Sequence, residues 1–132
     1  MTKSLLVHEH VSPFASEMSI QVVEQTRDQL QLLLPSSSRF HNRKGDVHGG
    51  AVTSLIDTTL GMAATEGDPP GTSCSTLTLT VNFLAPARGE LRCVSRVVRR
   101  GRSIRFLSAE VFDTEGNIVA NGSCTFKVFY PR

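Results

Sequence analysis

A histidine, two glycines and an aspartate near the middle of the sequence have the types and the spacing that could do chemistry. The segment VHGGAVTSLIDTTLG, residues 47–61, places His48 before Gly49 and Gly50, and Asp57 follows that histidine by nine residues. Backbone N–H groups at a helix start have no intrahelical partner and carry partial positive charge. They suit a carbonyl oxygen that becomes negative during a reaction, and a nearby carboxylate can act as a base or a nucleophile.

These residues also have plainer interpretations. A glycine pair often serves only a tight turn from loop to helix, and one aspartate on an amphipathic helix is usually a solvated position. Gly50 and Asp57 are seven residues apart, or two helical turns, so they share a face. The other members of that face are small and allow a backbone or a thin ligand to approach closely: Thr53, Ser54, Gly61 and Ala64. The combination favours a site.

An amphipathic helix over residues 49–65 must position these groups. Its apolar stripe recurs with helical period at Val52, Leu55, Ile56, Thr59, Leu60 and Ala63. The segment EGDPPG ends this helix, because it is rich in glycine and proline. A short helix over residues 13–17 is predicted as well, with Ser12 as N-cap and Pro13 at the first helical position.

Six strands are predicted around the long helix, over residues 19–23, 29–34, 76–83, 90–99, 103–112 and 118–128. In the third strand, polar residues (three threonines and Asn82) alternate with four apolar residues that are predicted to form one face: Leu77, Leu79, Val81 and Phe83. In the last strand, one predicted face consists of Ile118, Ala120, Gly122, Cys124, Phe126 and Val128, and Val119 belongs to the other. Because a sheet with one apolar face and an amphipathic helix must cover each other, the predicted fold class is α+β.

Length and composition narrow the classes of function. A chain of 132 residues suits one domain, residues 1–132, of which residues 1–11 are expected to be a flexible N-terminus. Three cysteines without paired spacing, and no signal peptide, predict a cytoplasmic protein with reduced thiols. A net charge of +2 and 6% aromatic residues argue against nucleic-acid binding. No apolar run is long enough to span a membrane.

The central segment HNRKGDVHGGAVTSLIDTTLGMAA resembles the helix region of hotdog-fold acyl-CoA thioesterases, in particular the PaaI-like branch of the 4-hydroxybenzoyl-CoA thioesterase superfamily. STLTLTVNFLAPARGE and VVRRGRSIRFLSAEVFDTEGNIVANGSCTF resemble its strands in the same order, so the resemblance covers residues 12–130. It implies an antiparallel sheet wrapped around one long central helix. It also implies a homodimer with a continuous sheet, and often a homotetramer.

The resemblance implies a role for individual residues. The N–H of Gly49 would polarise the thioester carbonyl, with Gly50 supporting the turn, and the Asn42 side chain would bind that carbonyl or the attacking water. His48 would shape the loop and hydrogen-bond near the thioester. Asp57 would be the catalytic carboxylate, as general base or as nucleophile. A hydroxyl at the start of the next strand would hold the water, with Thr76 favoured and Ser75 open.

Six arginines crowd one predicted hairpin: Arg92, Arg96, Arg99, Arg100, Arg102 and Arg105. A solvated strand edge explains them as well as a binding site does. By resemblance, the turn Gly101, Arg102 and Ser103, with Arg100 before it, lies near the nucleotide part of the ligand, where arginine forks would bind the phosphates of coenzyme A. No metal is predicted, because no carboxylate or thiol completes a ligand set with His8, His10 and His41.

The resulting prediction is an acyl-CoA thioesterase that converts a medium-chain or aromatic acyl-CoA to free acid and coenzyme A without a further cofactor. Two alternatives on the same fold are a non-catalytic domain that binds acyl-CoA or lipid and a hydratase or dehydratase. Asp57 argues against the first, since a binding site gains nothing from a carboxylate beside a thioester. The second would place its catalytic histidine elsewhere.

Overall fold

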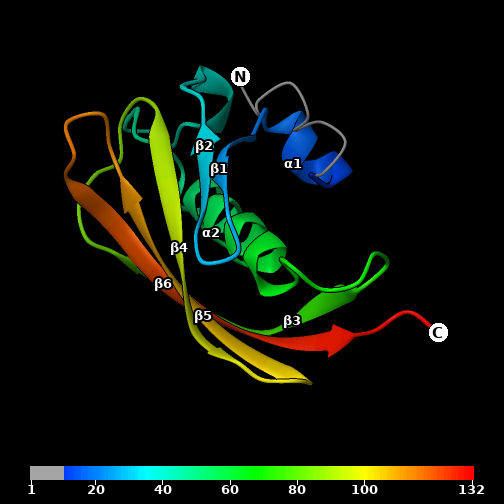
Figure 1. Cartoon of the computed structure of the whole chain (residues 1–132). Helices are drawn as coiled ribbons and strands as arrows, with labels where there is room; N and C mark the ends of the chain where they lie inside the picture. The colour runs from blue at the N-terminus through cyan, green and yellow to red at the C-terminus, as the bar shows by residue number, and fades with distance from the viewer. Residues whose placement is uncertain (1–10) are drawn as a thin grey trace.

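The computed structural model describes residues 11–132; most of the predicted flexible N-terminus, with His8 and His10, lies outside the described residues. Figure 1 shows the elements in chain order: α1 (Pro13–Glu17), β1 (Gln21–Gln25), β2 (Leu30–Leu34), a 3-10 helix (Ser38–Phe40), α2 (Gly49–Ala64), β3 (Ser73–Phe83), β4 (Leu91–Arg100), β5 (Ile104–Phe112) and β6 (Ile118–Phe129). Both predicted helices and all six predicted strands are present.

One antiparallel sheet contains all six strands in the order β1-β2-β4-β5-β6-β3. The sheet curves around α2, which contacts β2, β3, β4, β5 and β6 (Figure 1). The predicted stripe on α2 is buried throughout: Val52, Leu55, Ile56, Thr59, Leu60 and Ala63. This is the hotdog architecture, as predicted, and the apolar face of the sheet and the stripe of the helix form its core.

The long edge strand β3 departs from the predicted alternation. It begins at Ser73, three residues earlier than predicted, and its pairing with β6 shifts register between Thr76 and Thr78. The extra residue of such a bulge changes which side chains face the core. Thr76 therefore faces α2, Leu79 and Val81 also pack inward, and Leu77 is 55% exposed instead of belonging to the apolar face.

Two other strand predictions need correction. β1 begins at Gln21 instead of residue 19, because Ser19 has a φ of 59° and its N–H closes the end of α1 on the carbonyl of Ser16. In β6, Val119 is buried and Ile118 is 40% exposed, the reverse of the prediction. The β5–β6 pairing shifts register beside Phe112, at the residues that oppose this part of β6.

The C-terminal end of α2 is held by side chains from the sheet. Arg105 of β5 is buried, and its guanidinium donates to the carbonyl of Ala64 at 2.6 Å, to both carboxylate oxygens of Asp68 and to the hydroxyl of Tyr130. Arg100 donates to the same Ala64 carbonyl at 3.2 Å. Positive groups stabilise a helix C-terminus, whose last carbonyls lack helical partners. Two arginines of the predicted hairpin cluster therefore serve the fold.

We expect Arg105→Met to lower the free energy of unfolding by about 3 kcal/mol, because it leaves the mostly buried carboxylate of Asp68 without its cation. Urea denaturation at one fixed protein concentration measures the loss. Arg99→Met is the matched control on the same hairpin, where the side chain is exposed and the change should stay within about 0.5 kcal/mol. Equal losses in the two variants would contradict the buried anchor.

Candidate active site

Asp57 and Thr76 meet between α2 and the edge strand β3. The Thr76 hydroxyl donates a hydrogen bond of 2.8 Å to carboxylate oxygen Oδ1 of Asp57. The second carboxylate oxygen accepts no hydrogen bond from a described residue, and Asp57 is half-buried. The carboxylate is thus oriented on one side and open on the other, as a base or nucleophile requires.

Ser75 does not share this contact. Successive side chains of a strand point to opposite faces, so Ser75, adjacent to Thr76, is exposed on the outer face of the sheet. The choice left open by the sequence is thereby narrowed to Thr76 as the hydroxyl next to Asp57. Its role in holding a water stays a prediction.

The start of α2 leaves one backbone donor without a partner. His48 is the N-cap, and its ring nitrogen Nδ1 accepts a hydrogen bond of 2.8 Å from the N–H of Gly50. The N–H groups of Ala51 and Val52 donate to the His48 carbonyl. The N–H of Gly49 has no acceptor among residues 11–132. The predicted oxyanion donor is therefore available, and the N–H of Gly50, the residue predicted to support the turn, is bonded to the ring of His48.

Asn42 lies in the cleft that contains Gly49. Its side-chain oxygen accepts from the N–H groups of Lys44 at 2.9 Å and Asp46 at 3.1 Å, which fixes the side chain within the loop. Only its NH₂ group then remains to act on a ligand, and that group is a donor. The cleft has a volume of about 390 Å³, and the exposed ring of Phe83 forms its wall over Gly49. Two donors, from Gly49 and Asn42, thus share one partly apolar cleft.

The two pairs of predicted catalytic residues do not meet within one chain. Gly49 and Asp57 are eight residues apart on one helix, which separates them by about 12 Å along its axis. A reacting carbonyl group must lie about 3 Å from its oxyanion donors and within reach of the base. Within one chain, the two predicted half-sites, one at the start of α2 and one beside β3, are therefore separate.

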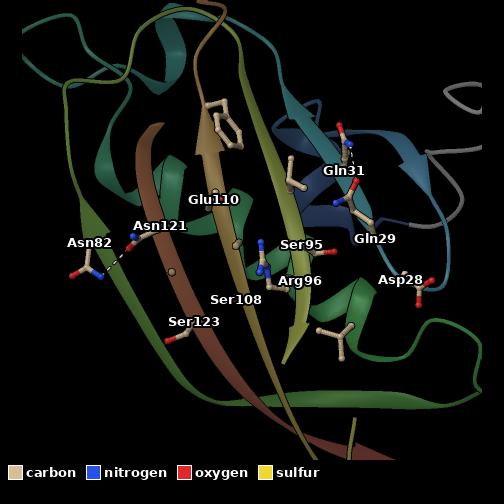
Figure 2. A pocket seen from close by; sticks show the side chains of 15 residues that line it. Asp28, Gln29, Gln31, Asn82, Ser95, Arg96, Ser108, Glu110, Asn121 and Ser123 are labelled. Atoms are coloured by element: carbon tan, nitrogen blue, oxygen red, sulfur yellow. Dashed lines mark hydrogen bonds between the residues drawn. The ribbon is translucent and has the colours of Figure 1, made fainter. Parts of the chain in front are cut away.

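A larger hollow lies elsewhere. It has a volume of about 1120 Å³ and extends over the face of the sheet opposite α2. Figure 2 shows its polar lining, with Arg96 from β4, Glu110 from β5, and Asn121 from β6 hydrogen-bonded to Asn82 from β3. None of the predicted site residues lines it. Size alone does not identify the site here.

The predicted phosphate-binding turn is only partly free to bind a ligand. Arg100 is engaged with the end of α2, and a Cβ at Gly101 would lie 2.4 Å from the Ile104 carbonyl, so this glycine serves the tight hairpin. Arg102 is exposed, and no described side chain accepts from its guanidinium. The Ser103 hydroxyl accepts from the Lys127 ammonium group at 3.4 Å. Arg102 and Lys127 are thus the better phosphate candidates, and sequence spacing alone did not indicate Lys127.

The described cysteines are poor candidates for a nucleophilic thiol, and the described side chains do not indicate a metal site. Burial raises the pKa of Cys93 and of Cys124 to about 12, so both thiols stay protonated at neutral pH. Burial and the charge of Asp57 also raise the pKa of Cys74. No group of three histidine, cysteine or acidic side chains within residues 11–132 could hold a metal ion. Within the same range, no helix is long and apolar enough to cross a membrane.

A family model of the thioesterase superfamily matches residues 44–120, more than half of the sequence. The chain belongs to this superfamily. It is 32% identical over 125 residues to a provisionally named esterase of Halobacterium salinarum, covering 86% of this chain and 83% of the relative. It is 23% identical over 111 residues to acyl-coenzyme A thioesterase 13 of Mus musculus, covering 80% and 77% of the two proteins.

A solved structure, that of a thioesterase from Haemophilus influenzae, has the same fold. Its TM-score is 0.89 with 20% sequence identity, and the match covers 98% of this chain and 91% of that one. The prediction of a superfamily member with a hotdog fold is confirmed. Membership of this superfamily supports thioester hydrolysis as the general activity of the chain. The PaaI-like branch and the residue roles stay predictions.

The contact between Thr76 and Asp57 gives a test that separates the two candidate hydroxyls. We expect Thr76→Val to lower the kcat of thioester hydrolysis about 10- to 100-fold, because a hydrogen bond to a charged group contributes about 1.5–3 kcal/mol. Thr76→Ser should keep most of the rate. Ser75→Ala, one residue away on the outer face, is the matched control and should match the wild type. A larger loss in Ser75→Ala than in Thr76→Val would reverse the assignment.

Proposed function

We propose that the chain hydrolyses the thioester bond of an acyl-CoA to a free acid and coenzyme A. The observation that carries the proposal is the unpartnered N–H of Gly49 at the N-terminus of α2, in one cleft with the Asn42 side chain. Two donors at a helix N-terminus stabilise the oxyanion that forms when a thioester carbonyl is attacked. Membership of the superfamily supports the same activity.

Asp57 supplies the second half of the reaction. As a general base, it takes a proton from water as the water oxygen attacks the carbonyl carbon, and the C–S bond then breaks to release the thiolate of coenzyme A. As a nucleophile, it attacks that carbon itself, the C–S bond breaks to release the thiolate of coenzyme A, and water then hydrolyses the resulting anhydride. Thr76 orients the carboxylate in either route. Both routes use only the thioester, water and Asp57, so neither needs a cofactor. Coenzyme A enters as part of the substrate.

The complete site is proposed to span two chains. Gly49 and Asp57 are too far apart to act on one carbonyl within a chain, so the start of one α2 must face Asp57 of another. Edge strand β3 could join the two chains. Charged residues and proline usually protect a free sheet edge from pairing, and none of the eleven residues of β3 is charged or a proline. Pairing of two β3 strands across a two-fold axis would give the predicted homodimer with a continuous sheet. A homotetramer built from such dimers stays a prediction.

The substrate is proposed from the charged and apolar surroundings of the half-sites. Arg102, in the turn between β4 and β5, and Lys127, whose ammonium group contacts Ser103 of the same turn, would bind the phosphates of coenzyme A. The wall of Phe83 and Leu84, both more than half exposed, suits an apolar acyl group next to Gly49. A medium-chain or aromatic acyl group, the PaaI-like branch and a cytoplasmic location complete the proposal.

We expect Asp57→Asn to abolish turnover while folding and binding of coenzyme A are retained. The change is nearly isosteric and removes only the base or nucleophile, so kcat should fall about 10²- to 10⁴-fold. A thiol reagent follows release of coenzyme A from a panel of acyl-CoAs, and calorimetry follows binding. Glu115→Gln, an exposed carboxylate in the β5–β6 turn, is the control. Full binding with no hydrolysis in the wild type would instead favour the non-catalytic acyl-CoA-binding domain.

A mixture of two inactive variants tests whether sites are shared between chains. Asp57→Asn and Asn42→Ala are unfolded and refolded together. If the two residues serve one site from different chains, each mixed dimer has one intact site, and about a quarter of wild-type activity should return in a random mixture. If both residues of a site come from one chain, every site carries a defect. No recovery, with wild-type refolding confirmed alongside, would rule out the shared site.

A further inference from the structure

Three large apolar side chains are exposed near the turn that joins β4 and β5. Val98 of β4 is 64% exposed, and Phe106 of β5 and Phe129 of β6 are 41% and 48% exposed. Single exposed apolar side chains are common on soluble proteins, but a group of them on one face marks a surface that meets another molecule. The proposed pairing of two β3 strands does not account for this group, because β6 separates β4 and β5 from β3.

The alternation of side chains places the two phenylalanines on the outer face of the sheet, opposite α2. Phe106 lies between Arg105 and Leu107, which are both buried on the side of α2. Phe129 follows the buried Val128 in the same way. Because successive side chains of a strand point to opposite faces, both aromatic rings face away from the core.

Val98 is exposed because of a bulge in β4. The pairing of β4 with β5 shifts register between Val97 and Arg99, so Val98 is the extra residue and has no partner on β5. Arg99 is paired with Phe106, and residues directly opposite each other on neighbouring strands share a face. The bulge therefore exposes an apolar side chain and places a cation beside Phe106.

A second cation lies on the same face. Lys127 is exposed on the outer side of β6, between the buried Phe126 and Val128, and its ammonium group lies 6.0 Å from the centre of the Phe129 ring. Three apolar and two positive side chains thus form one surface across β4, β5 and β6. This surface is the hairpin patch: Val98, Arg99, Phe106, Lys127 and Phe129.

No acidic side chain balances the positive charges within the hairpin patch. The acidic residue of β5, Glu110, is four residues from Phe106, or about 13 Å along the strand. Glu110 lines the polar hollow of the outer face instead, together with Asp28 and Arg96, as Figure 2 shows. Two copies of the patch would repel each other, so the complementary partner is a negatively charged surface.

We propose that the hairpin patch binds the surface of a lipid membrane that contains anionic headgroups. Arginine and lysine are attracted to such headgroups, and apolar side chains enter the boundary between headgroups and acyl chains. The apolar side chains favour a membrane over a nucleic acid, whose phosphates would engage the cations alone. The contact needs no segment that crosses the bilayer. It goes beyond the proposed hydrolysis and does not depend on it.

The proposed homodimer would present two hairpin patches to one membrane. The two-fold axis that pairs two antiparallel β3 strands in a continuous sheet is perpendicular to that sheet. Such an axis keeps the outer faces of both chains on the same side. Two contacts with one surface bind more tightly than either contact alone, because the second forms within the complex made by the first.

Two double variants of identical composition test the proposal. Val98→Ser/Arg99→Gln changes the hairpin patch, and Val23→Ser/Arg43→Gln makes the same exchanges elsewhere. Val23 is likewise the exposed extra residue of a bulge, in β1, and Arg43 is exposed in the loop before α2. The full chain, without coenzyme A, is mixed with vesicles of phosphatidylcholine alone or of equimolar phosphatidylcholine and phosphatidylglycerol. Flotation then measures the fraction of protein bound, and urea denaturation verifies that each variant is folded.

The wild type should float with the mixed vesicles and not with phosphatidylcholine alone. Val98→Ser/Arg99→Gln should bind the mixed vesicles at least about tenfold more weakly, because one cation near an anionic surface contributes about fivefold and the lost apolar contact adds to this. Val23→Ser/Arg43→Gln should bind like the wild type. Phe106→Ser, on another strand of the patch, should also weaken binding.

Three results would overturn the proposal: no binding of the wild type to the mixed vesicles, equal binding to both kinds of vesicle, or equal losses in the two double variants. Binding of a single-stranded oligonucleotide through the patch, without vesicle binding, would assign the surface to a nucleic acid instead. Self-association that only the patch variants lose, again without vesicle binding, would assign it to a second copy of the chain.

Discussion

The burial of one face of α2 against the sheet is the interaction on which the rest of the structure depends. Leu55, Ile56 and Leu60 are fully buried, and five strands contact this helix. Because that stripe must face the sheet, Asp57 lies at its margin, beside edge strand β3 and outside the core, whereas Ala64, predicted to share its face, is fully buried. The carboxylate is therefore held on a rigid element without being buried in the core, where an ionised group would be costly.

The backbone groups at the two ends of α2 differ in their hydrogen bonds. The contacts at one end stabilise the fold, and the open donor at the other end is a candidate binding group. At the C-terminus, Arg100 and Arg105 supply donors to the last carbonyls. At the N-terminus, His48 satisfies three amides and leaves that of Gly49 free. A helix with a purely structural role would be more stable if the backbone groups at both of its ends had hydrogen-bond partners. The single amide left open lies in a cleft with a second donor, Asn42, which is why the helix start is interpreted as a binding site.

The sequence predicts well those features that repeat with a regular period. The stripe of α2 and the order of six strands follow from apolar spacing, and the boundaries of α2 follow from His48-Gly49-Gly50 and the glycine–proline segment. Register shifts are not visible in this way: the bulge after Thr76 adds one residue and reverses the phase, so the predicted apolar face wrongly includes Leu77. Contacts between distant segments are equally hidden. Arg105, Asp68 and Tyr130 form one cluster, although nothing in their spacing relates them.

The same bulge explains why Asp57 has a hydroxyl as its partner. Because the phase changes after Thr76, this threonine faces α2 while Leu79 and Val81, further along, still face the core. Two acidic residues of the loops before and after α2 are paired with arginines: Asp46 with Arg88 and Asp68 with Arg105.

An arginine balances the charge of the carboxylate with which it pairs, whereas the Thr76 hydroxyl only orients Asp57 and leaves its second oxygen open. Asp57 has no such cation among residues 11–132. The two arginine-paired carboxylates hold the loops at either end of the helix in place. The one between them is oriented but left free to take a proton or to attack a carbonyl, which is the property that hydrolysis of a thioester requires.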